Sequence, residues 1–195
     1  MGGLTSVLAP IAFVNETALR LGRAVGIVAI ALMVIAILIQ VFFRYVLGNA
    51  LPWPDEAARF CMLWMTGLMA PTAFRRGGFV AIDMVPLMLP RVLGQVLTLF
   101  LLVVSLAVLL VAVNIGWAEV TGFGGKFATA ALYIPTSLGF DEWYRIPRSW
   151  MMASLLVGVF LLILVNIELI LRSVITLLGG GDLLPEIADA PVGAE

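Results

Sequence analysis

VLGQVLTLFLLVVSLAVLLVAVNIGW, residues 92–117, contains no charged side chain and only four polar ones. An α-helix rises 1.5 Å per residue, so about 20 residues cross the hydrocarbon core of a bilayer, which is ~30 Å thick. Residues 92–117 are therefore long and apolar enough to cross a membrane as one helix.

Three further stretches on either side of this one have a similar character. A first apolar run begins at Ala24 and is interrupted only by Gln40, and it is too long for the core of a cleaved signal peptide. The second run is the least apolar, and the last ends beyond Asn166 and Glu168. The sequence thus predicts four transmembrane helices, at residues 24–46, 54–74, 91–117 and 149–172.

The composition agrees with this reading and excludes several classes of protein. Apolar residues make up 63% of the chain and charged residues 12%, against roughly 45–50% and about 25% in soluble domains. The net charge of −1 gives no basic surface for nucleic acid. There is no histidine and only one cysteine, Cys61, which removes the usual ligands of haem, zinc and copper. We expect an all-α integral membrane protein that is not an enzyme, with no catalytic, cofactor-binding or metal-binding residues.

The connections complete the predicted organisation. Residues 77–90 are apolar but too short to cross, and we expect them to lie at the membrane interface between the second and third helices. Residues 1–178 form one transmembrane domain, and residues 179–195 form an acidic, disordered tail. Arg75 and Arg76 directly follow the second helix, and positive residues favour the cytoplasmic side. Both termini are therefore predicted to be cytoplasmic.

The first candidate site lies between the first and second helices. Gln40 and Arg44 are four residues apart and share one helix face. Arg44 has two readings: a boundary arginine that reaches the headgroups, or the partner of an acid at the start of the second helix. That helix start is Trp53-Pro54-Asp55-Glu56, where the helix dipole favours negative charge, with Arg59 placed to pair with Glu56.

Two small or polar patterns predict helix packing. Gly22 and Gly26 form a small-xxx-small pair that would let two helices approach closely. Gln95, Thr98 and Ser105 lie on one side of the third helix. We interpret them as interhelical packing groups, with a permeation path as the alternative.

In this order, the motifs resemble those of the DctQ-like small membrane subunits of tripartite ATP-independent periplasmic (TRAP) transporters. The similar features span residues 20–172 and are Phe43-Arg44-Tyr45, Trp53-x-Asp55-Glu56, Arg75-Arg76-Gly77, Val80-Ala81-Ile82-Asp83, Ala131-Leu132-Tyr133-Ile134-Pro135 and Ile146-Pro147. Phe79 departs from the family, which usually has histidine there, and the acid pair is Asp-Glu rather than Glu-Glu.

The resemblance implies a partner role in the bacterial inner membrane. It implies a small permease subunit that scaffolds a large membrane subunit during sodium-coupled uptake of an organic acid, which a periplasmic binding protein delivers. Membrane lipid surrounds the bundle. The residues that it marks as structural or partner-interface candidates are Arg44, Trp53, Asp55, Glu56, Arg59, Arg75, Arg76 and Asp83.

Two other classes of function remain as alternatives. One is a self-sufficient small channel or exporter formed by several copies of the chain, which the small-residue pair and the polar side of the third helix would allow. The other is a membrane redox subunit, which the absence of histidine disfavours.

Overall fold

The computed structural model describes residues 2–77, 89–135 and 143–180. In this part of the chain the elements follow one another as α1 (Gly2–Tyr45), α2 (Trp53–Arg75), α4 (Arg91–Thr121), the 3₁₀ turn η1 (Phe123–Lys126), β1 (Ala128–Pro135), β2 (Trp143–Pro147) and α5 (Ser149–Leu177). The predicted interfacial segment falls largely in residues 78–88 and the predicted tail largely in 181–195, both outside the described residues.

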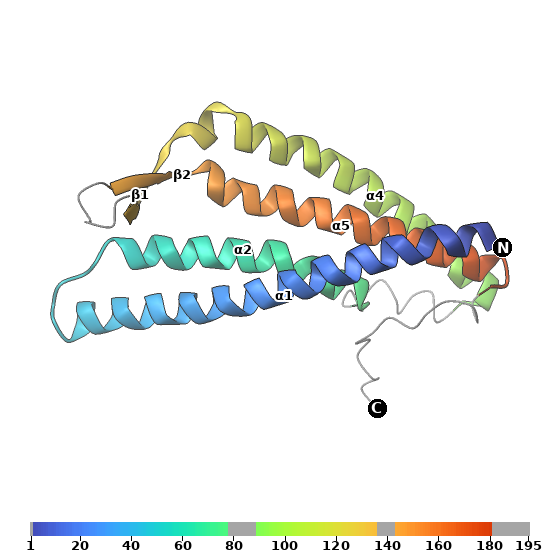
Figure 1. Ribbon diagram of the computed structural model, residues 1–195, viewed down its shortest axis with the longest axis horizontal. Coiled ribbons are helices and arrows are strands. Elements are labelled where there is room, and N and C mark those ends of the chain that lie inside the picture. The colour runs from blue at the N-terminus through green and yellow to red at the C-terminus, as the bar shows by residue number, and fades with distance from the viewer. Residues whose placement is uncertain (1, 78–88, 136–142, 181–195) are drawn as a thin grey trace.

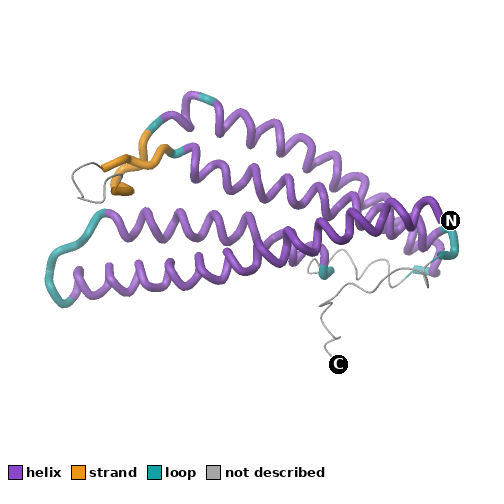
Figure 2. Tube along the Cα trace, in the orientation of Figure 1, coloured by secondary structure: helices purple, strands orange, loops and turns teal. Residues whose placement is uncertain are grey.

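The helices form two antiparallel pairs, α1 with α2 and α4 with α5 (Figures 1 and 2). Helix α2 also packs along α5, and this contact joins the two pairs into one bundle. The strands and the α1–α2 connection lie at one end of the bundle, and the N-terminus lies at the other (Figure 1). The polar groups described below are gathered toward these two ends.

Three helical stretches are long and apolar enough to cross a membrane: Leu8–Tyr45, Val92–Thr121 and Ser149–Leu177. They confirm a mostly helical, multi-pass membrane protein. Helix α2 forms where it was predicted, but it is not among the three. Its crossing of the membrane therefore stays a prediction.

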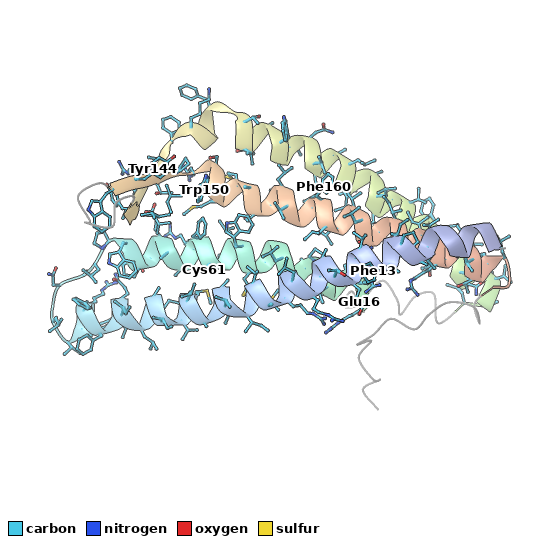
Figure 3. The ribbon with its side chains drawn as sticks, viewed as in Figure 1. Phe13, Glu16, Cys61, Tyr144, Trp150 and Phe160 are labelled. Atoms are coloured by element: carbon cyan, nitrogen blue, oxygen red, sulfur yellow. The ribbon has the colours of Figure 1, made fainter. Side chains whose placement is uncertain are left out.

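The outside of the bundle is apolar, as lipid requires. Exposed Val, Ile, Leu and Phe side chains follow α1 and α4 along most of their length, for example Val28, Leu32 and Phe100. Aromatic side chains mark the end that carries the strands, where Tyr144 lies on β2 and Trp150 in the first turn of α5 (Figure 3). Tyrosine and tryptophan are enriched where a membrane meets water, so this end fits the headgroup level.

Helix α1 begins well before the span predicted from Ala24. It starts at Gly2, includes Pro10, and has 44 residues. At 1.5 Å per residue it is about 66 Å long, more than twice the hydrocarbon thickness. Leu8, Asn15 and Leu19 are buried in this N-terminal half, because it packs on α5. The start of the predicted span was based on apolarity alone, which gives no information about this tertiary contact.

The connection between α4 and α5 contains a small sheet that was not predicted. Strands β1 and β2 pair antiparallel, with Tyr133 opposite Arg145, Ile134 opposite Tyr144 and Pro135 opposite Trp143. The fold is therefore a helical bundle with a two-stranded hairpin at one end. The sequence 128–147 has no strict alternation of apolar and polar residues, and that pattern is the usual signal of a half-buried strand.

Helices α2 and α5 touch through their backbones. A Cβ atom at Gly67 would lie 2.4 Å from the carbonyl oxygen of Ser154, and one at Gly158 would lie 2.7 Å from the carbonyl oxygen of Gly67. At the α1–α2 contact, a Cβ at Gly22 would lie 3.1 Å from the Leu68 carbonyl oxygen. Gly22 and Gly26 thus face α2, in the close approach that their spacing predicted.

Candidate functional site

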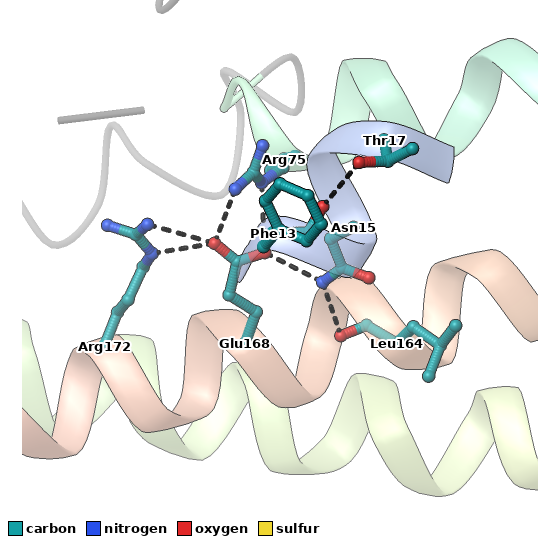
Figure 4. Close-up of polar contacts among 7 residues, drawn as sticks. All are labelled: Phe13, Asn15, Thr17, Arg75, Leu164, Glu168 and Arg172. Atoms are coloured by element: carbon teal, nitrogen blue, oxygen red, sulfur yellow. Dashed lines mark hydrogen bonds and ion pairs between the residues drawn. The ribbon is translucent and has the colours of Figure 1, made fainter. Parts of the chain in front are cut away.

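A buried carboxylate, Glu168 on α5, holds the end of the bundle that lies nearer the N-terminus (Figure 4). Arg75 at the end of α2 donates two hydrogen bonds to this carboxylate, from Nε to Oε2 at 3.0 Å and from Nη2 to Oε1 at 2.8 Å. Asn15 of α1 donates to Oε2 at 2.8 Å, and Arg172 donates from Nε to Oε1 at 3.0 Å. Glu168 is 0% exposed and Arg75 8%. We call these four residues the inner cluster.

The inner cluster ties three helices together. Asn15 also donates to the backbone carbonyl of Leu164 at 3.1 Å, so α1 is fixed to α5 by two bonds. A buried charge is strongly unfavourable unless it is paired and hydrogen-bonded, and here the carboxylate is surrounded by donors. The arrangement serves to lock α1, α2 and α5 in register.

Sequence reasoning found only part of this cluster. Arg75 was predicted as a structural residue, but its partner Glu168 was noted only as a polar residue near the end of the last span. A signal was present, because Glu168 and Arg172 are four residues apart near the end of an apolar helix, and that spacing favours an ion pair. Asn15 gave no such signal, because it precedes the predicted span.

At the other end of the bundle, Glu56 fastens the hairpin to α2. Its carboxylate accepts the backbone N–H of Ala130 at 2.7 Å and also that of Ala131. Arg145 on β2 donates to the carbonyl oxygens of Thr129 and Ala130, the latter at 2.8 Å. Glu56 therefore binds β1 of the hairpin, whereas the sequence had suggested a pair with Arg59.

Asp55 and Arg44 are not brought together. Gln40 Nε2 lies 3.5 Å from Asp55 Oδ2, so the glutamine and not the arginine faces this acid. The guanidinium of Arg44 lies 5.8 Å from the centre of the Tyr45 ring, at the exposed end of α1. This position fits the boundary reading of Arg44.

The remaining candidates are placed as follows. Trp53 and Arg59 are exposed on α2. Arg76 is half-buried directly after α2. Asp83 lies outside the described residues.

We expect the Glu56→Ala variant to loosen the hairpin. The change removes two charge-assisted bonds to β1, each worth about 1.5–3 kcal/mol when well shielded and less at this partly exposed site. Trypsin should then cut faster after Lys126, which is exposed beside the hairpin. Asp55→Ala is the matched control, because within the described part of the chain its carboxylate makes just the long contact with Gln40. Equal cleavage rates in the two variants would contradict this role of Glu56.

At both ends of the bundle, the bonded polar side chains described above hold helices and strands together. Among the described residues no three His, Cys, Asp or Glu side chains are grouped to hold a metal ion. The carboxylates of Glu168 and Glu56 are both used in internal bonds. In α4, the hydroxyl of Thr98 donates to the carbonyl of Gly94 in its own helix.

Comparison with known proteins agrees with this picture of a membrane component. The family model described as "Tripartite ATP-independent periplasmic transporters, DctQ component" matches residues 33–176. No curated protein and no solved structure matches the chain. The matched region runs from within α1 almost to the end of α5, and it includes Glu56, Arg75 and Glu168. The chain belongs to the DctQ family, the small permease component of TRAP transporters.

Proposed function

We propose that the chain is a static scaffold for the large membrane subunit of a TRAP transporter, during sodium-coupled uptake of an organic acid delivered by a periplasmic binding protein. The inner cluster is the observation that carries this proposal. A buried carboxylate bonded by three helices favours one arrangement of the bundle, because breaking any bond leaves a charged or polar group unpaired. A subunit that holds its shape in this way is suited to support a partner that moves.

We further propose that the chain crosses the membrane four times, with both termini in the cytoplasm. On α2, the residues between Arg59 and Arg75 are uncharged, and the helix from Asp55 to Arg75 measures about 30 Å, the thickness of the hydrocarbon core. On α5, the distance from Ser149 to Glu168 is about 28 Å by the same measure. Arg75, Arg76 and Arg172 lie at the end nearer the N-terminus, which supports a cytoplasmic location for that end.

Co-purification tests the scaffold role. The tagged chain should bring down a large multi-span membrane protein from native membranes in mild detergent. The Glu168→Ala variant should recover much less of it, because the bundle loses its inner cluster. The matched control is Glu16→Ala, which removes an exposed pair with Arg20. If the native chain is recovered without a large partner, the proposal is wrong.

A further inference from the structure

Helix α2 has one face that no other described helix covers. It packs against α1 on one side and α5 on the other. On the third side, exposed residues recur at steps of four, three, four and seven. We call this set the α2 stripe: Asp55, Arg59, Met62, Thr66 and Ala73. Such heptad spacing is the pattern by which two helices pack along a common seam.

The α2 stripe differs from the other exposed surfaces of the bundle. The large hydrophobic residues exposed on α2 are Trp53, Met62 and Leu63, whereas many such residues are exposed along α1 and along α4. Within the proposed membrane span, the stripe presents Met62 as its one large hydrophobic residue, together with Arg59, Thr66 and Ala73. Large apolar side chains are favoured where a helix faces lipid tails. Where a helix faces another helix in a membrane, small side chains and hydrogen-bonding groups are favoured.

Arg59 makes contact between this face and lipid tails unfavourable. It is exposed about one turn inside the start of α2, and it forms no ion pair with any described residue. Ionisable residues within membrane segments almost always face a protein interior or a paired group. The Arg59 guanidinium, with its five donors, can therefore bind an acceptor supplied by another polypeptide.

We propose that the α2 stripe is the surface on which the large membrane subunit docks. The docking helix presents small side chains toward Thr66 and Ala73, and a carboxylate or free backbone carbonyl toward Arg59. The inference rests on the scaffold function proposed above and adds the face that performs it.

A second copy of this chain fits the α2 stripe less well. Two-fold related copies in one membrane would meet with identical residues at the same depth. The two Arg59 side chains would then approach each other, and like charges in a poorly hydrated environment repel strongly. The charge of the stripe thus favours a different partner, with an acceptor at this depth.

Site-specific photo-crosslinking tests the proposal in the complete transporter. A benzophenone side chain is placed at Met62 or Thr66 on the stripe, and at Val28 on α1 or Val111 on α4 as controls. Val28 is matched in depth to Thr66, because Gly26 lies against Met69, and both valines are exposed. Irradiated membranes should yield an adduct of this chain with the large subunit from the two stripe positions, several-fold more than from the controls.

A bulky substitution on the stripe gives a second test, with recovery of the large subunit as the measurement. Thr66→Trp should lower the recovery of the large subunit several-fold, while Val28→Trp should retain it. Both exposed positions leave the bundle core unchanged, so each purified variant should melt like the native chain. Stripe adducts that contain two copies of this chain or only lipid, or full recovery with Thr66→Trp, would overturn the docking surface. Failure of the native chain to co-purify with a large subunit would instead overturn the proposed function.

Discussion

The Glu168→Ala variant is expected to lose about 3–5 kcal/mol of bundle stability, the usual effect of leaving a buried charge unpaired. Arg75 is 8% exposed and would lose both of its bonds, while Arg172 and Asn15 would each lose their carboxylate partner. The midpoint of thermal unfolding, followed by helical circular dichroism in detergent, measures this loss.

The matched control is an ion pair of the same kind at the surface. Arg20 and Glu16 lie 3.0 Å apart, but their side chains are 74% and 42% exposed. Glu16→Ala should therefore change stability by less than about 1 kcal/mol. Similar midpoints for Glu168→Ala and Glu16→Ala would show that the inner cluster does not hold the bundle.

A paired replacement separates charge from packing. Arg75→Leu together with Glu168→Leu removes the buried ion pair and leaves apolar side chains in its place. Such replacements are often neutral or stabilising, so the double variant should be more stable than either single one. Asn15 and Arg172 would still lose their carboxylate partner, so the double variant should remain less stable than the native chain.

The second large effect is expected at the contact of α2 with α5. Gly67→Ala would place a methyl group 2.4 Å from the Ser154 carbonyl oxygen, and no side chain can move to make room. The helices must separate, which typically costs about 1–3 kcal/mol, and the bulkier Gly158→Leu should cost more.

Gly116→Ala provides the control within a helix of the same bundle. Its new methyl would lie 3.4 Å from Leu156 Cδ1, a flexible atom at ordinary contact distance. Its unfolding midpoint should stay close to that of the native chain. The close backbone contact between α2 and α5 would be disproved if all three variants melted together.

The helices could be predicted from the sequence because a membrane makes one simple demand, about 20 apolar residues in a row. That demand located α4 and α5 well, since Arg91 and Ser149 begin both the predicted spans and the observed helices. It gives no information on where helix α1 begins, and this helix continues beyond the predicted span to Gly2, where it packs on α5.

The partners of the polar residues could not be predicted in the same way. Local spacing offered Arg59 as the partner of Glu56, but the carboxylate reaches Ala130 and Ala131, more than seventy positions away. Glu168 likewise meets Arg75 across 93 positions of sequence. Which helix faces which is decided by packing of the whole bundle, and this information is not present in any local window.

Measuring the flux carried by the chain on its own tests the central claim most directly, since the carboxylates of Glu168 and Glu56 are both bonded within the chain. Uptake of a labelled organic acid is measured in liposomes that contain this chain alone, the large subunit alone, or both, each with the binding protein and an inward sodium gradient. We predict uptake only when both membrane components are present, and reduced uptake with Glu168→Ala. Saturable uptake by liposomes that contain this chain alone would contradict the account.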